Sequence, residues 1–289
     1  MGKNMVLRLI EHGWEITAYD PRTESVREVE DQGAVGAGSI EELARMTAVP
    51  RLLWLMVPHR SVDDVLNTLT PLLNAGDTVI DGGNSNYRES IRRAGILKER
   101  GIGFLDAGVS GGPQGAREGA CVMVGGEKEL FEKHETLFRD IAAPDAYGYM
   151  GRSGAGHFVK MVHNGIEYGM MQAIAEGFTV LRESGFDLDL TEVCRVYNRR
   201  SVIESRLTGW LLKAFEEYGT ELDEISGSVS HSGEGLWTVE TAKELGVSVP
   251  IIEGSLKFRE ESKRHPSYTG RILSALRNQF GGHEVRRKD

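Results

Sequence analysis

The chain has few cysteines, no long apolar run and no excess of positive charge, and each shortage excludes a class of protein. Two cysteines, Cys121 and Cys194, cannot form a disulfide framework, and neither has metal-ligand spacing. A reducing, cytoplasmic location is therefore expected. The longest apolar run, residues 52–58, is far too short to cross a membrane. A formal net charge of -9 provides no positively charged surface for a nucleic acid. Neither a membrane nor a nucleic acid is therefore expected as a partner.

The order of the predicted elements indicates two domains within 289 residues. Up to about residue 153, short apolar strands alternate with amphipathic helices, which is typical of a doubly wound parallel sheet. The predicted strands cover residues 14–19, 52–57, 78–81, 103–107 and 121–124. Beyond residue 153, helices are predicted at 155–184, 189–198, 203–218, 237–245 and 250–263. We therefore expect an α/β Rossmann-like N-terminal domain, residues 1–153, followed by an all-α C-terminal domain, residues 154–289.

A block of polar residues near the middle of the chain is the strongest indication of a site. Lys160, His163, Asn164 and Glu167 have the spacing i, i+3, i+4 and i+7, which places them on one side of a helix. Met161, Val162 and Ile166 would face the other way and be buried. A solvated helix face is the alternative, but the segment is poor in ordinary surface residues. The Ser-Gly-Ala-Gly run at 153–156 also suits backbone held close to a ligand.

Three features fall at the carboxyl ends of predicted strands, where open parallel sheets bind ligands. Asp20 follows the first predicted strand, 18 positions after Gly2, a spacing that suits an acceptor for the ribose 2′-hydroxyl of NAD. The runs 81–85 (Asp-Gly-Gly-Asn-Ser) and 110–113 (Ser-Gly-Gly-Pro) each combine a glycine pair with polar neighbours. Both suit backbone contact with a polyhydroxylated substrate, and a plain tight turn is the alternative.

The dinucleotide fingerprint is incomplete. It requires a strand, then G-x-G-x-x-G, then a helix, and this sequence offers the helix and one candidate glycine, Gly2. The first strand and the first two glycines are missing from the sequence. We therefore expect that the native chain carries roughly ten more residues ahead of Met1, as the fingerprint requires.

Five blocks, in order along almost the whole chain, resemble the decarboxylating 6-phosphogluconate dehydrogenase family, in its short bacterial form. They are residues 81–85, 108–112, 160–168, 235–238 (Gly-Leu-Trp-Thr) and 277–283 (Arg-Asn-Gln-Phe-Gly-Gly-His). The wider β-hydroxyacid dehydrogenase family shares the Ser-Gly-Gly turn and the spacing of Lys160 and Asn164. His163 and Glu167 favour the phosphogluconate branch.

The resemblance implies oxidative decarboxylation of 6-phosphogluconate to ribulose 5-phosphate and CO2, with reduction of NAD in preference to NADP and no metal. It implies that Lys160 is the general base and acid at the substrate 3-hydroxyl, and that Glu167 protonates C1 of the enediol. The implied substrate-binding residues are Asn84, Ser110, Gly111, Gly112, His163, Asn164, Tyr168, Thr238, Arg259, Arg277 and His283. The implied cofactor-binding residues are Gly2, Asp20, Val57 and Asn84. Arg277 and His283 would complete a neighbouring subunit's site in a dimer or tetramer.

One departure from the family and the incomplete fingerprint leave two other functions open. Leu236 stands where many relatives have a lysine that contacts phosphate, with Arg259, Lys257 or Lys263 as possible substitutes. A β-hydroxyacid dehydrogenase acting on an unphosphorylated 3-hydroxy acid is the first alternative. The second, suggested by the incomplete fingerprint, is an inactive fragment that acts only as an oligomerising helical domain. The active site is expected between the two domains.

Overall fold

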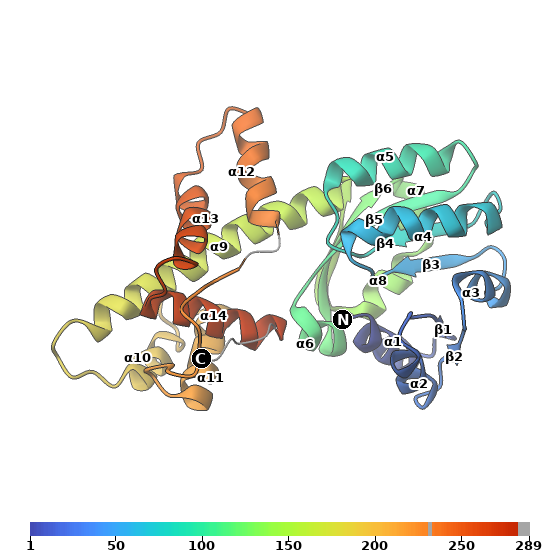
Figure 1. The fold of residues 1–289 in the computed structure, drawn as a ribbon. Helices are drawn as coiled ribbons and strands as arrows, with labels where there is room; N and C mark the ends of the chain where they lie inside the picture. Colours follow the sequence, from blue (N-terminus) through green and yellow to red (C-terminus); the bar gives the residue numbers. More distant parts are fainter. Residues whose placement is uncertain (231–232, 283–289) are drawn as a thin grey trace. The chain divides into compact units, whose positions relative to one another are not determined.

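The computed structural model describes residues 1–230 and 233–282 (Figure 1). By its internal contacts the chain divides into two compact units, Met1–Lys160 and Met161–Asp289. The first unit is α/β and the second is helical, which confirms the predicted fold class.

The first unit is built on a five-stranded sheet in the order β3-β4-β5-β6-β7. The strands are β3 (Leu52–Leu55), β4 (Thr78–Asp81), β5 (Gly103–Ser110), β6 (Ala120–Gly126) and β7 (Ala142–Gly151). All neighbours are parallel except β5 and β6, which are antiparallel. Two very short strands, β1 (Thr17–Ala18) and β2 (Val35–Gly36), pair with each other in a separate parallel sheet.

The five-stranded sheet is buried on both faces, as a doubly wound fold requires. Successive residues of β4 enter different cores, because strand side chains alternate between faces. Val79 packs with Leu66 and Leu97, whereas Ile80 packs with Met5 and Leu105. The covering helices are α1 (Gly2–Glu11), α2 (Thr23–Glu30), α3 (Ile40–Met46), α4 (Val62–Leu69), α5 (Tyr87–Lys98), α6 (Gly112–Glu118), α7 (Lys128–Lys133) and α8 (Glu135–Ile141).

The second unit packs its helices around one apolar core. That core includes Met171, Phe178, Leu211, Phe215 and Leu276, all with at most 3% of their surface exposed. The helices are α9 (Ala155–Arg182), whose first turns belong to the first unit, α10 (Leu190–Tyr197), α11 (Arg206–Tyr218), α12 (Glu234–Glu244), α13 (Pro250–Ser262) and α14 (Tyr268–Gly281). Within this unit α11 lies against both α10 and α14 (Figure 1).

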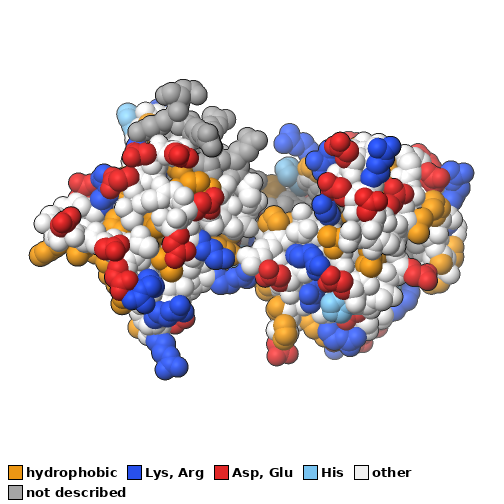
Figure 2. Space-filling model, turned by 90° about the horizontal axis from the view of Figure 1, so that it is seen from below, with side chains coloured by type: hydrophobic (Ala, Val, Ile, Leu, Met, Phe, Trp, Pro, Cys, Tyr) orange, Lys and Arg blue, Asp and Glu red, His pale blue; other side chains and the backbone are white. Residues whose placement is uncertain are grey.

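Polar caps define where several of these helices begin. The side chains of Asp189, Ser205 and Ser267 accept hydrogen bonds from the first free backbone N–H groups of α10, α11 and α14. On the surface shown in Figure 2, acidic and basic side chains are interspersed. Within the described residues, no helix has both the length and the apolarity that a bilayer crossing requires.

Candidate active site

Helix α9 buries the polar side that the sequence analysis identified. Lys160 and Asn164 are each only 9% exposed, and Tyr168, one turn further, is 5% exposed. Met161 is buried as expected, but Ile166 is 53% exposed, so the expectation that it would be buried was wrong. The helix places Ile166 on the side away from the buried residues at i, i+4 and i+8. Buried polar side chains and an exposed isoleucine are the opposite of the usual distribution in a helix. This distribution indicates a functional site.

Neighbouring residues along the polar stripe are close enough to interact. The His163 ring nitrogen Nδ1 lies 3.0 Å from Asn164 Oδ1 and 3.8 Å from Glu167 Oε2. The side chains of His163 and Glu167 are partly exposed, at 39% and 21%. A proton donor or acceptor on a substrate could therefore reach both of them.

A fully buried carboxylate fixes the start of α9. Asp106, on β5, accepts hydrogen bonds from the backbone N–H groups of Gly154, at 2.6 Å, and His157, at 2.8 Å. The His157 ring in turn pairs with Ser90 Oγ on α5, at 2.7 Å. Because unpaired N–H groups and the positive end of the helix dipole favour an anion, Asp106 stabilises this end of α9 from a different element.

Glycines press the first turns of α9 onto the sheet. A Cβ atom at Gly108 would lie 2.4 Å from Lys160 Cβ, and one at Gly156 would lie 2.5 Å from the carbonyl oxygens of Asp106 and Met123. Real Cβ atoms do not approach this closely, so glycine is required for the observed packing. The backbone of Lys160 is therefore held directly against β5.

Two turns at the sheet edge present the predicted polar groups. Gly111 and Gly112, at φ values of 117° and 64°, form the turn after Ser110 at the end of β5. Asp81, at the end of β4, accepts from Gly83 N and Ser85 Oγ and is paired with the buried Arg93, which shapes the loop containing Asn84. β4 and β5 are parallel neighbours, and the register places Asp81 beside Asp106. The two turns therefore leave adjacent strands at one edge of the sheet.

Of the predicted cofactor residues, Asp20 and Val57 follow strands and Gly2 begins a helix. Asp20 follows β1, and its Oδ1 accepts from Arg22 N at 2.9 Å and Arg22 Nε at 3.3 Å. Gly2 is the first residue of α1, and Val57 follows β3, with its carbonyl oxygen 2.8 Å from where a Cβ of Gly83 would lie. Gly2 is the one glycine in α1.

In the second unit, two arginines lie near one tyrosine ring. The Arg259 guanidinium is 3.5 Å from the centroid of the Tyr168 ring, and Arg259 is 1% exposed. Arg277 donates to Ser230 Oγ at 2.9 Å. Among the described residues neither arginine has an ion-pair partner, and Arg259 Nε has no hydrogen-bond partner. Burial lowers the pKa of Arg259 to about 10 and also lowers the pKa of Arg277.

Helix α12 packs against α9 beside these arginines. Thr238 Oγ1 donates to the carbonyl oxygen of Met161, at 2.8 Å, and that hydroxyl fills the space beside Gly165. Asn164 Nδ2 donates to Glu234 Oε1 at 3.2 Å. Leu236 is partly buried on the same helix. The predicted residue His283 lies outside the described residues.

Asp106, Arg93 and Glu234 are among the buried charged residues that were not predicted from the sequence. The burial of Asp106 was predictable, because its carboxylate interrupts the otherwise apolar run Phe104–Val109. For Arg93 and Glu234, only the packing shows that the side chains are buried.

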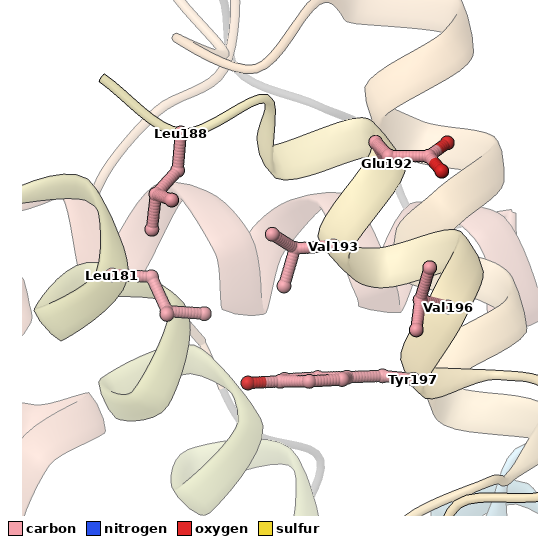
Figure 3. Close-up of a pocket in the computed structure, with 6 residues that line it drawn as sticks. All are labelled: Leu181, Leu188, Glu192, Val193, Val196 and Tyr197. Carbon is pink, nitrogen blue, oxygen red and sulfur yellow. The ribbon is translucent and has the colours of Figure 1, made fainter. Parts of the chain in front are cut away.

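A shallow pocket elsewhere in the second unit is almost entirely apolar. It is lined by Leu181, Leu188, Glu192, Val193, Val196 and Tyr197, with the Tyr197 ring lying flat along one side (Figure 3). None of the predicted site residues that the structure describes lines it. No group of three or more His, Cys, Asp or Glu side chains in the described residues is placed to hold a metal.

The fold and these residues define the class, an NAD(P)-binding oxidoreductase. Residues 1–163 match the family model described as the NAD binding domain of 6-phosphogluconate dehydrogenase, and residues 156–269 match that of its C-terminal domain. The chain belongs to the 6-phosphogluconate dehydrogenase family. The resemblance inferred from the sequence is thereby confirmed.

Individual relatives agree. A Bacillus subtilis protein, YqeC, which carries a provisional 6-phosphogluconate dehydrogenase name, is 49% identical over 288 residues, covering 100% of this chain and 97% of its own length. The NAD(+)-dependent, decarboxylating enzyme of Haloferax volcanii is 42% identical, over 100% of this chain and 96% of its own. The solved Plasmodium falciparum 6-phosphogluconate dehydrogenase, studied with NADP+ and with 6-phosphogluconate, matches with a TM-score of 0.80 and 30% identity. This chain covers 60% of that longer chain and is itself 92% covered.

Proposed function

We propose that this chain oxidises and decarboxylates 6-phosphogluconate to ribulose 5-phosphate and CO2. The observation that carries the substrate assignment is the arginine pair, Arg259 and Arg277, beside Tyr168. A buried guanidinium without a carboxylate partner is costly unless an anion binds it. A terminal phosphate supplies that anion, and the bidentate geometry of arginine suits it.

The same observation weighs against an unphosphorylated substrate. Leu236 removes one expected cation from α12, but Arg259 and Arg277 supply two from α13 and α14. An uncharged substrate end would leave both unpaired. We therefore favour the phosphorylated substrate over a simple 3-hydroxy acid.

The proposed chemistry begins at Lys160. When bound, the nicotinamide accepts a hydride from C3 of the substrate. Lys160 takes the proton of the 3-hydroxyl and then hydrogen-bonds the resulting carbonyl, which stabilises the negative charge that develops as CO2 leaves. Glu167, two turns along α9, protonates C1 of the enediol. No metal ion is needed in this scheme, because the lysine performs the electrophilic role.

The remaining predicted residues position the substrate. His163 and Asn164 extend the polar stripe of α9, and Asn84 with the Ser110–Gly112 turn contributes polar groups from the sheet edge. Tyr168 and Thr238 accompany the arginines at the phosphate. We retain residues 1–153 and 154–289 as the proposed domain boundaries, since α9 begins at Ala155.

The proposed cofactor is NAD in preference to NADP. Asp20 supports this choice, since a carboxylate accepts the ribose hydroxyl and repels a 2′-phosphate. Replacing Asp20 by Ala should raise KM for NAD. It should also lower the ratio of kcat/KM with NAD to kcat/KM with NADP by about 10-fold or more, as loss of a charged hydrogen bond does. An unchanged ratio, measured with both cofactors at saturating substrate, would remove the basis for the preference.

The decisive test compares three substrates. NADH and CO2 formation would be followed with 6-phosphogluconate, gluconate and 3-hydroxyisobutyrate. We expect turnover of 6-phosphogluconate alone, and loss of that turnover in Lys160→Met. Equal rates with gluconate would reject the phosphate assignment.

We also propose a cytoplasmic location and self-association as a dimer or tetramer. Exposed apolar side chains support association: Val180 on α9, Phe186 in the loop after it and Val196 on α10 are 69%, 79% and 50% exposed. His283 remains the residue proposed to complete a neighbour's site, whereas Arg277, predicted to act there too, is assigned to the phosphate site of its own chain. Light scattering at several protein concentrations tests the assembly, and a strictly monomeric, fully active protein would contradict it.

A further inference from the structure

Glu234 is a buried carboxylate that takes no direct part in the proposed chemistry. It is the first residue of α12 and only 3% exposed. Acidic residues are almost never buried so deeply unless their oxygens have partners. Its backbone carbonyl accepts from Thr238 Oγ1 at 2.9 Å, and the next residue, Gly235, packs on the Tyr168 ring. Glu234 is therefore held among the residues proposed to bind substrate.

One oxygen of Glu234 begins a chain of hydrogen bonds. Glu234 Oε1 accepts from Asn164 Nδ2 at 3.2 Å, and Asn164 Oδ1 lies 3.0 Å from His163 Nδ1. A carboxylate can only accept, so the NH2 group of Asn164 must face Glu234 and its Oδ1 must face the ring. His163 Nδ1 must then carry the proton, which leaves Nε2 as the acceptor nitrogen of the neutral ring.

The other oxygen indicates a ligand. Glu234 Oε2 is buried and has no hydrogen-bond partner among the described residues. A buried acceptor without a donor is destabilising, and such atoms are uncommon unless a bound group supplies the donor. A substrate with several hydroxyl groups supplies donors of this kind.

We propose that Glu234 is a positioning residue: it fixes the orientation of the Asn164 amide and, through it, the tautomer of His163. The inference rests on the proposed function only in naming a polyhydroxylated acid as the substrate. With Glu234 in place, Asn164 and His163 present one defined pattern of donors and acceptors. Without its charge, the Asn164 amide can turn over and the pattern is no longer unique.

The tautomer can be measured without any turnover. In protein labelled with ¹⁵N-histidine, the His163 resonances are assigned by their loss in His163→Gln, and the spectra are recorded at a pH where the ring is neutral. We expect Nδ1 of the wild-type protein to be the protonated nitrogen, and Glu234→Gln to shift His163 toward the Nε2-protonated form. A wild-type ring already protonated on Nε2 would overturn the proposal without need of a variant.

Kinetics give the second readout, with Glu240→Gln as the matched control. Glu240 is exposed on the same helix. We expect Glu234→Gln to lower kcat/KM for 6-phosphogluconate by about 10-fold, the effect of losing a charged hydrogen bond, and Glu240→Gln to change nothing. Unchanged His163 shifts and rates in a folded Glu234→Gln protein would overturn the positioning role while the proposed function stood. A wild-type enzyme inactive on 6-phosphogluconate would reject the function and leave the tautomer result intact.

Discussion

Replacing Arg259 by methionine should lower the activity on 6-phosphogluconate strongly and change the free energy of unfolding little. The side chain is 1% exposed, and burial lowers its pKa from the ordinary arginine value to about 10. Since one pKa unit corresponds to about 1.4 kcal/mol, holding this cation in the folded protein costs on the order of 3 kcal/mol. The native state releases the proton near pH 10 and the unfolded chain only at higher pH, so the cost is fully present at neutral pH and fades as the pH rises above about 10.

Methionine removes that cost and fills much of the same space. Against the gain stands the cation–π contact with Tyr168, which contributes up to about 2 kcal/mol when desolvated. The free energy of unfolding should therefore change by less than about 2 kcal/mol in either direction. The loss of a buried guanidinium from a bound phosphate should cost about 2–5 kcal/mol, which lowers kcat/KM for 6-phosphogluconate by at least about 30-fold.

The assay pairs urea unfolding with steady-state kinetics, and Lys257→Met is the control. Lys257 is exposed on the same helix and pairs only loosely with Glu261, at 3.6 Å. We expect Lys257→Met to retain full activity. If Arg259→Met lost several kcal/mol of stability, or kept its full rate on the phosphorylated substrate, the arginine would be a structural residue and the phosphate argument would be refuted.

Two further predictions concern the first turns of α9. Gly108→Ala would place a Cβ 2.4 Å from Lys160 Cβ, so kcat should fall by about 10-fold or more and stability by about 1–3 kcal/mol. Gly95→Ala, with nothing within 4 Å, is the control and should be slightly stabilising; equal kinetics in the two variants would refute the close packing. Asp106→Asn should lower the free energy of urea unfolding by about 1–3 kcal/mol, because one buried N–H of Gly154 or His157 loses its acceptor. A loss below about 0.5 kcal/mol would show that Asp106 does not anchor α9.

Long periodic segments were predictable from the sequence, and irregular ones were not. The predicted helix at 155–184 is observed as α9, because apolar residues recur along it with helical spacing. β7 was missed because Pro144 and two glycines interrupt its alternation, and its residues are mostly only half-buried. The missed α14 begins at a serine cap rather than at an apolar residue, and only its packing on α11 makes the helix apparent.

Candidate site residues show the same division. Lys160, Asn164 and Tyr168 were identified from spacing and from the family resemblance. Glu234 was not, because Gly233 and Gly235 made the start of α12 look like a loop and the predicted helix began at residue 237. Gly233 in fact adopts φ 107° as the residue before the helix, so the helix begins one turn earlier and turns Glu234 inward.

Helix α9 also shows how a site can tolerate buried polar groups. Between Lys160 and Tyr168 the buried side includes Lys160 and Asn164 as well as Met161, while Ile166 faces solvent, so buried polar groups replace part of the apolar burial of an ordinary helix. Its ends are held by other means. Asp106 and the glycine contacts secure the first turns, and Met171 and Phe178 enter the apolar core further along. Because the anchors lie outside the segment, substitutions within the stripe should change the chemistry more than the stability, whereas substitutions at the anchors should change both.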